Sequence, residues 1–419
     1  MCDNIFPFGF WNVLPATKFG TEGVKDWADF GSTLTMTGFY DLSPDKDEML
    51  AILDECHAKG IRMIFCDRRI VFNSLHDAGF EETMRQDIKD FASHPAIFGF
   101  YLGDEPLDNQ MEDVIETVRF FKGLCPDKQP FINLLPWVPW LNYNGNDTGL
   151  IAADKENYKE HLIDFVKRTG VEILSFDCYT QMSIYPDNSP MEKGIDIYFK
   201  NLLMFQEAAA ETGAELWLTT LATGHAGVRC PTQDDIRWEI STAAAHGVKS
   251  LFYWYMYSET YNINYRLHPI NQLNERTDTF KFISTENRIF QMVYGSVFRE
   301  LSLEKAYHTL KAYGGFPLLE EDCDYFIRDV YNGESAPMIV SRFSRKSDPE
   351  KTYYALVNGS QRGYASAYVK FTRPVEIFGV QSEDGGINVW SNGFKDKDND
   401  LHFWFSPGQI WVFAVQEKL

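Results

Sequence analysis

The sequence predicts an α/β protein: a (β/α)₈ (TIM) barrel followed by a small antiparallel β-sandwich domain. Eight short apolar runs alternate with amphipathic helical stretches over residues 5–300, which is the pattern of a parallel sheet wound with helices. From about residue 306 the runs become alternating and poor in helix, with turn signals between them, which is typical of antiparallel sheet. We therefore predict a barrel at residues 1–305 and a β-sandwich at residues 306–419.

The barrel elements follow from the β-rich runs and from helix start and stop signals. Thr232 opens a helical segment that Gly247 closes, and Ser43-Pro44 opens one that Gly60 closes. Eight parallel strands are the number that closes a barrel. The predicted strands are residues 6–14, 33–40, 62–66, 97–102, 130–135, 172–176, 216–221 and 250–255. The predicted helices include residues 45–59, 109–124, 154–169, 191–212 and 232–246.

One long helix and a series of strands are expected after the barrel. Residues 274–294 have a helical pattern long enough to pack across it. Asn358-Gly359 and Asp384-Gly385-Gly386 are turn signals between strands. No Pro- or Ser-rich linker precedes this part of the chain, so we expect the sandwich to dock rigidly on the barrel. Its predicted strands are residues 338–343, 353–357, 366–371, 375–380 and 410–415.

Charge and composition exclude several classes of function. The formal net charge is −21 and no basic patch is present, so neither a nucleic acid nor an anionic membrane is an expected partner. Seven cysteines without CxxC or metal-type spacing predict free thiols rather than a disulfide framework. There is no HExxH motif, Gly-rich phosphate loop or dinucleotide fingerprint, so we expect neither a metal nor a cofactor.

The N-terminus carries an expectation about location. Met1-Cys2-Asp3-Asn4 has no basic region followed by an apolar run, and no window of the chain approaches membrane-spanning length. These features predict a cytoplasmic protein, although a secreted protein would look the same once its signal peptide had been removed. The oligomeric state is left open.

The strongest chemical signal is Gly103-Asp104-Glu105-Pro106, directly after an apolar run. A carboxylate pair at the end of a barrel strand is where a barrel enzyme would hold a proton donor. Glu105 is therefore the leading catalytic candidate. In the structural alternative, Asp104 caps the helix that begins near Asn109, and Glu105 is a solvated acid.

The other predicted strand ends bring acids, amides and aromatic rings to the same rim. Flat rings stack on the apolar faces of sugars while carboxylates and amides bind the hydroxyl groups, so this mixture favours a polyhydroxylated ligand. Asp177 ends a buried strand, where an unpaired acid is costly without a partner or a task. The predicted substrate-binding residues are Trp11, Asp67, Arg68, Asp104, Trp137, Tyr179, His225, Trp254 and Glu259.

Several of these residues also have a purely structural interpretation. Asp67 pairs with Arg68 or Arg69 in that interpretation, which the sequence favours for this acid. His225 is then a neutral hydrogen-bonding residue in a Gly-flanked loop, and Glu259 is a solvated loop acid.

These segments resemble the barrel glycoside hydrolases of clan A, most of all the family 42 β-galactosidase-like barrels and relatives with a GDEP motif. The resemblance covers most of residues 5–310 and rests on residues 103–106, on residues 175–179 and on Arg229-Cys230-Pro231 followed by Arg237. It implies that Glu105 is the acid/base. The nucleophile of such enzymes is normally a Glu at the end of strand seven, where this chain has none.

Glycoside hydrolysis usually needs two carboxylates, so the second must come from a position other than the end of strand seven. Asp177 is preferred, with Glu259 next and Asp104 third, and both retaining and inverting outcomes stay open. The predicted function is an exo-acting glycosidase for a terminal, β-linked, galactose-like sugar in an oligosaccharide or glycoside. The alternative is a non-catalytic carbohydrate-binding barrel, or pseudoenzyme, which the missing strand-seven glutamate supports.

Overall fold

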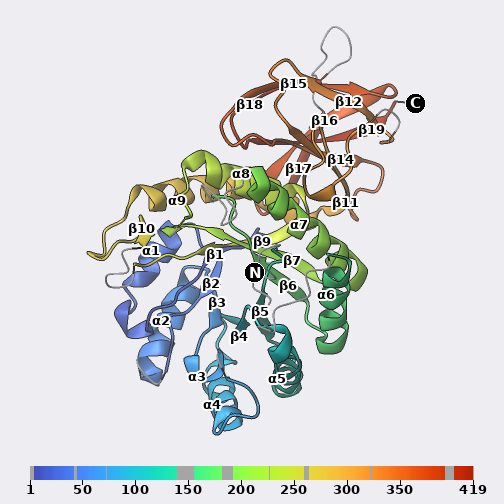
Figure 1. The fold of residues 1–419 in the computed structure, drawn as a ribbon. Helices are drawn as coiled ribbons and strands as arrows, with labels where there is room; N and C mark the ends of the chain where they lie inside the picture. The colour runs from blue at the N-terminus through green and yellow to red at the C-terminus, as the bar shows by residue number, and fades with distance from the viewer. Residues whose placement is uncertain are drawn as a thin grey trace.

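The predicted barrel is confirmed (Figure 1). Its strands form one parallel sheet in the order β1-β9-β7-β6-β5-β4-β3-β2. They are β1 (Phe8–Phe10), β2 (Leu34–Met36), β3 (Arg62–Phe65), β4 (Ile97–Asp104), β5 (Gln129–Leu134), β6 (Ile173–Asp177), β7 (Glu215–Leu221) and β9 (Val248–Trp254). The computed structural model describes residues 4–41, 45–71, 73–138, 155–181, 192–225, 227–258, 264–320, 323–391 and 401–418.

The seam between β1 and β2 is closed largely by threonine side chains. The backbone N–H of Thr33 donates to the carbonyl oxygen of Phe8 at 2.9 Å. The buried Thr35 hydroxyl accepts from the Phe10 N–H at 3.0 Å and donates to the Phe10 carbonyl at 2.9 Å. Hydroxyl groups thus take the place of ladder hydrogen bonds where the sheet meets itself.

Helices surround the barrel, and the cap signals that lie in the described residues behave as expected; Gly60, for example, follows the second helix with a φ of 72°. Thr232 accepts a hydrogen bond from the backbone of Asp235 in a capping box, and Gly247 ends the same helix with a φ of 86°. Ser43-Pro44 lies outside the described residues, and the side chain of Asp45 caps the helix that follows. The helices are α1 (Gly23–Asp29), α2 (Lys46–Ala58), α3 (Arg68–Val71), α4 (Phe80–Phe91), α5 (Met111–Leu124), α6 (Lys155–Thr169), α7 (Glu192–Thr212) and α8 (Gln233–Ala245).

The long helix predicted after the barrel begins later and is interrupted. It comprises α9 (Asp278–Phe290), a π-helical turn (Gln291–Gly295) and α10 (Ser296–Glu300). Asn274, where the prediction begins, has a φ of 60° and belongs to a turn, because asparagine tolerates the left-handed conformation that a helix cannot include. No helix of the described ranges is long and apolar enough to span a bilayer.

Two antiparallel sheets follow the barrel, as predicted. One has the order β11-β13-β14-β19-β16-β17 and the other the order β12-β15-β18. The strands are β11 (Ser302–His308), β12 (Ile327–Asn332), β13 (Met338–Ser344), β14 (Thr352–Asn358), β15 (Ala365–Phe371), β16 (Val375–Glu383), β17 (Gly386–Ser391), β18 (Leu401–Phe405) and β19 (Ile410–Glu417). A domain boundary at residue 305 stays a prediction.

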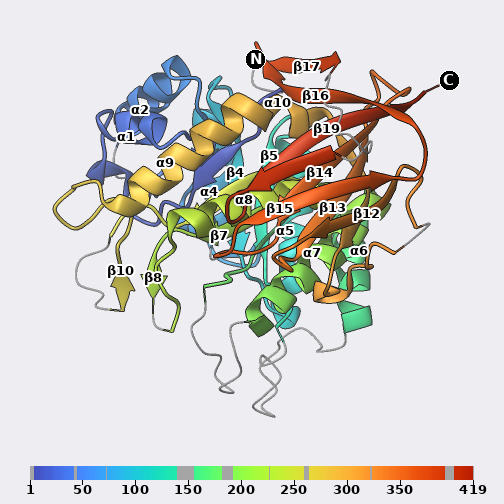
Figure 2. The same ribbon diagram turned by 90° about the horizontal axis from the view of Figure 1, so that it is seen from above.

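The larger of these sheets is buried on both faces. In β14, Tyr353 and Ala355 join the core shared with the barrel helices, whereas Tyr354 and Leu356 pack between the two antiparallel sheets. The sheet lies against α8 and α10 (Figure 2). A third core of mostly large apolar side chains fills the interior of the barrel and supports the floor of the site above it.

Candidate active site

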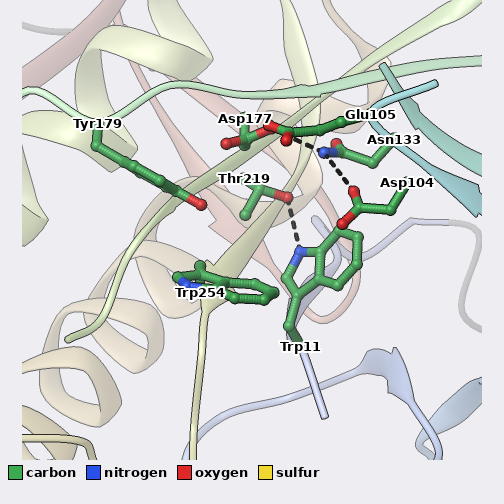
Figure 3. A pocket seen from close by; sticks show the side chains of 8 residues that line it. All are labelled: Trp11, Asp104, Glu105, Asn133, Asp177, Tyr179, Thr219 and Trp254. Atoms are coloured by element: carbon green, nitrogen blue, oxygen red, sulfur yellow. Dashed lines mark hydrogen bonds between the residues drawn. The ribbon is translucent and has the colours of Figure 1, made fainter. Parts of the chain in front are cut away.

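A pocket of about 180 Å³ opens at the C-terminal ends of the barrel strands (Figure 3), which is where barrel enzymes bind their ligands. Side chains from β1, β4, β5, β6, β7 and β9, or from the residues directly after them, converge there. The described residues that line it are Trp11, Asp104, Glu105, Asn133, Asp177, Tyr179, Thr219 and Trp254.

The acidic pair follows directly from the course of β4. Asp104 is its last residue, and Glu105 leaves the strand with a φ of 42°, a left-handed conformation that is unusual for a residue other than glycine. The Glu105 N–H still donates to the Asn133 carbonyl at 2.8 Å. The helix-cap interpretation of Asp104 does not hold, because Leu107 and Gln110 occupy the cap positions of the next helices.

Asn133 of β5 joins the acids of two neighbouring strands. Its Nδ2 donates to Asp177 Oδ1 at 2.8 Å and to Asp104 Oδ1 at 3.3 Å. The orientation of its amide is set by the Ser175 hydroxyl, which donates to Asn133 Oδ1 at 3.1 Å. One neutral donor group thus stabilises the ionised forms of two acids.

Glu105 and Asp177 lie close enough for their carboxyl groups to interact directly, and Tyr179 also acts on the Asp177 carboxylate. Removal from water, then repulsion by Asp177 and Asp104, raises the pKa of Glu105. The Glu105 side chain is exposed to the pocket, so removal from water is not the decisive cause. Repulsion by the two neighbouring acids raises its pKa even when the carboxyl group is hydrated. Burial also raises the pKa of Asp177, but hydrogen bonds from Asn133, Glu105 and Tyr179 oppose that effect.

Within the pair, the interaction raises the pKa of Glu105 and opposes the rise in the pKa of Asp177, so a proton shared by the two acids is held by Glu105. Asp177 is then the ionised partner. Asp104 is intermediate: partial burial followed by repulsion from Asp177 raises its pKa to about 7, and the hydrogen bond from Asn133 opposes this.

Aromatic rings form the wall opposite the acids (Figure 3). Trp11 packs edge-on against Trp254 with ring centroids 5.5 Å apart, and against Tyr101 at 5.4 Å. The Trp11 Nε1–H donates to Thr219 Oγ1 at 3.0 Å, which fixes the indole in the pocket. This combination of ring faces and carboxyl groups suits a sugar.

Some predicted site residues are brought together and others are not. Trp11, Asp104, Glu105, Asp177, Tyr179 and Trp254 all line the pocket. Asp67, Arg68, Trp137 and His225 do not, and Glu259 lies outside the described residues.

Asp67 and Arg68 have partners of their own. The fully buried Asp67 carboxylate is bonded by the guanidinium of Arg69, whose Nε donates at 3.0 Å to both of its oxygens, as the structural interpretation of this acid expects. Arg68 lies over the ring of Phe39 and pairs with Asp41 at 3.5 Å. Asp67 and Arg68 therefore make structural contacts with other side chains and do not line the pocket.

His225 and Trp137 flank the site. The His225 ring lies between Tyr179, 5.9 Å away edge-on, and Tyr265, stacked at 5.1 Å; burial lowers its pKa, so it is neutral at pH 7. The backbone of Trp137 exchanges two hydrogen bonds of 2.8 Å with the Asn201 side chain of α7.

Asn133 and Thr219 were not predicted from the sequence. Asn133 is the single polar residue in the apolar run 131–135, and that isolation is a usable signal. Thr219 carries no such signal, because threonine is ordinary in a strand. Among the described residues, no cluster of His, Cys, Asp and Glu could hold a metal ion.

Comparison with known proteins supports the fold. No family model matches the chain, and no curated sequence does. Solved structures with a similar fold include a β-galactosidase from the psychrophilic Marinomonas ef1 (10% identity, TM-score 0.52, 70% of this chain and 62% of that one). The match to a glycoside hydrolase family 5 protein from Bacteroides vulgatus (10% identity, TM-score 0.52) covers 98% of this chain and 89% of that one. The match to Eubacterium rectale Amy13B (10% identity, TM-score 0.54) covers 100% of this chain and 96% of that one.

The chain therefore shares its barrel fold with glycoside hydrolases. It spans 62% of the length of the Marinomonas β-galactosidase. At 10% identity the likeness concerns the fold alone, and the chemistry has to be argued from the pocket.

Proposed function

We propose that this protein is a glycoside hydrolase that removes a terminal sugar, with Glu105 as general acid/base and Asp177 as the second carboxylate. The observation that carries the proposal is the pair of neighbouring carboxyl groups of Glu105 and Asp177 in a pocket walled by Trp11 and Trp254, with the pKa of Glu105 raised by the other acids. An acid and a base side by side are what hydrolysis of a glycosidic bond requires.

In this mechanism the sugar ring lies on the indole wall, and Glu105 protonates the departing oxygen. Asn133 donates to Asp177 and favours its ionised form, which attacks the anomeric carbon or activates a water. The hydrogen bond between the two acids must open when the substrate enters, because the glycosidic oxygen takes the place of Asp177 as acceptor.

The direct interaction between the two acids favours retention of configuration. Carboxyl groups within hydrogen-bonding reach can separate to the roughly 5–5.5 Å typical of retaining enzymes with small side-chain rotations. In inverting enzymes the two carboxyl groups lie roughly 6.5–9.5 Å apart, because a water must fit between one of them and the sugar. We therefore expect the first product to keep the anomeric configuration of the substrate, which proton NMR of the reaction mixture measures.

The pocket also favours a small neutral sugar. Its volume of about 180 Å³ is below the roughly 300–1,000 Å³ of pockets for drug-sized ligands, so it suits one ring. Three carboxyl groups and no Lys or Arg line its described part, which disfavours uronic acids and phosphorylated sugars. A β-linked, galactose-like unit is the first choice, supported by the resemblance to family 42 and by the β-galactosidase that shares the fold.

A non-catalytic carbohydrate-binding barrel is the second candidate. It is favoured by the end of β7 (Glu215–Leu221), where a catalytic glutamate would be expected. The only glutamate of this strand is its first residue, and Thr219 lines the pocket instead. A panel of nitrophenyl glycosides separates the two functions. Turnover that is lost in Asp177→Asn supports the hydrolase, whereas sugar binding by calorimetry without turnover of any glycoside supports the binding protein.

A further inference from the structure

Glu239 of α8 is a buried carboxyl group that the mechanism does not use. Its side chain has no solvent exposure. Its Oε1 accepts hydrogen bonds from Gln181 Nε2 at 2.6 Å and from Thr180 Oγ1 at 3.3 Å. Both donors belong to the strand-six segment, residues 177–181, which also carries Asp177 and Tyr179 of the pocket.

The same segment is held from the sandwich side. Gln361, between β14 and β15, donates from Nε2 to Thr180 Oγ1 at 3.3 Å, and Trp238 of α8 donates from Nε1 to the Gly359 carbonyl at 2.8 Å. Thr180, Gln181 and Gln361 are all buried. Helix α8 and the strand-six segment are therefore tied to one loop of the sandwich.

Two buried acceptors in this cluster have no hydrogen-bond partner: Glu239 Oε2 and Gln181 Oε1. A carboxylic acid and a primary amide are complementary, because the amide N–H donates to one carboxyl oxygen while the carboxyl O–H donates to the amide oxygen. The first of these bonds is present. A single proton on Oε2 supplies the second and satisfies both acceptors.

The surroundings agree with a protonated carboxyl. Burial raises the pKa of Glu239 to about 8, and repulsion by Asp235 adds to this, while the hydrogen bonds and Arg229 act in the opposite direction. The titratable and charged groups that face it are Asp235, Arg229, Cys178, Tyr198 and Tyr253.

We propose that Glu239 is held as the neutral acid and is a positioning residue. Its pairing with Gln181 fixes the strand-six segment and thereby places Asp177 and Tyr179 in the pocket. The consequence for catalysis rests on the proposed function, whereas the pairing itself does not.

The first experiment follows thermal unfolding against pH in the wild-type protein and in Glu239→Gln, whose amide reproduces both hydrogen bonds of the neutral acid. A glutamate in the unfolded chain ionises near 4.3, whereas Glu239 in the folded protein keeps its proton. The wild type therefore loses stability as pH rises from about 5 to 8, by up to about tenfold in the folded-to-unfolded ratio per pH unit. The melting-temperature difference from Glu239→Gln should widen across that window. Parallel curves would overturn the proposal.

The second experiment measures amide hydrogen exchange in the strand-six segment. Glu239→Leu should speed exchange there about tenfold or more, while Glu239→Gln and the control Glu286→Gln should not. Glu286 is a buried acid of α9 that pairs with Arg237 at the same junction, without contacting the segment. If Glu239→Leu does not fold, Thr180→Val is the replacement variant. It removes the hydroxyl that links Glu239 to Gln361. Unchanged exchange in the folded variant contradicts the positioning role.

The third experiment concerns turnover. Glu239→Leu should lower kcat about tenfold or more with a smaller change in KM, and Glu239→Gln should restore it. A loss of kcat that Glu239→Gln does not restore would overturn the positioning role. If the wild-type protein hydrolyses no glycoside, the proposed function fails, but the pH and exchange experiments still decide whether Glu239 holds the segment.

Discussion

A single proton, shared between Glu105 and Asp177, is the feature on which the proposed chemistry depends. Glu105 keeps it because two neighbouring acids raise its pKa, while Asn133 donates a hydrogen bond to the ionised form of Asp177. The two residues are equally acidic in water to within half a unit, so their different roles come from their surroundings.

Substitution of Glu105 should depend on the leaving group. Glu105→Gln should lower kcat by about 10²–10⁴ on glycosides with poor leaving groups, and much less on nitrophenyl glycosides, whose departing phenol needs no proton. Asp177→Asn should depress turnover of both, because an attacking or activating carboxylate is needed whatever leaves. Steady-state kinetics on the two substrate types measure this. Near-normal activity in Asp177→Asn, together with a dead Glu259→Gln, would transfer the second role to Glu259.

Removal of the Asn133 amide should move the acidic limb of the pH profile. Asn133→Ala deletes a donor to ionised Asp177 and Asp104, so both acids keep their protons to higher pH. A hydrogen bond to a charged group contributes about 1.5–3 kcal/mol, so the limb of kcat/KM should rise by about 1–2 pH units. Ser175→Ala removes the hydroxyl that orients the amide but keeps the amide itself, so it should move the limb in the same direction by a smaller amount. A profile that does not move would show that neither acid must be ionised.

At the scale of elements, the β1/β2 seam is where the barrel depends on side chains. Thr35→Val keeps the shape of the side chain but leaves the buried N–H and C=O of Phe10 without their hydroxyl partner. We expect the free energy of unfolding to fall by about 1–3 kcal/mol, measured by denaturant titration. Thr33→Val should lower the free energy of unfolding less, because the Thr33 hydroxyl makes a single part-buried hydrogen bond, from the Phe8 N–H at 3.3 Å. Equal losses would contradict the assigned importance of Thr35.

The elements also show why sequence patterns predict some strands better than others. The predicted sandwich strands of residues 338–343 and 353–357 lie in the middle of the larger sheet, where both faces are apolar. β11 was not predicted, because it is an edge strand whose first residues, Ser302-Leu303-Glu304-Lys305, are largely exposed and polar. Hydrophobic pattern reports burial, so a solvated edge strand gives little signal.

At the scale of the whole molecule, a buried histidine pair lies where the barrel meets the sandwich. His246, at the end of α8, donates from Nδ1 to the Thr242 carbonyl at 2.7 Å, so its Nε2 accepts from His308 Nε2 of β11 at 3.2 Å. His308 Nδ1 is then a buried acceptor without a partner. Burial lowers the pKa of His246 to about 4 and holds that of His308 well below its usual range.

Acid should therefore destabilise the folded protein through this pair. Both rings are neutral when folded, but the unfolded chain binds protons near 6.5, so stability is complete above that pH and falls as pH drops toward 4. His308→Gln keeps a donor for His246 and removes one titrating ring, so the slope of unfolding free energy against pH should flatten by about 1.4 kcal/mol per unit. Denaturant titrations between pH 4 and 7 test this. An unchanged slope would mean that His308 is already protonated in the folded state.

The sequence by itself determined the local part of this protein. The alternation of strands and helices, the caps at Thr232 and Gly247, and the exposure of Glu105 at a strand end depend on residues within a few positions of each other. Tertiary structure decided the partners. It joined Trp11 to Thr219, bridged Asp104 and Asp177 through Asn133, and buried both faces of the larger sheet. Asn133 lies 44 residues from Asp177, and side-chain periodicity contains no information about which distant strand brings which group to the same end of the barrel.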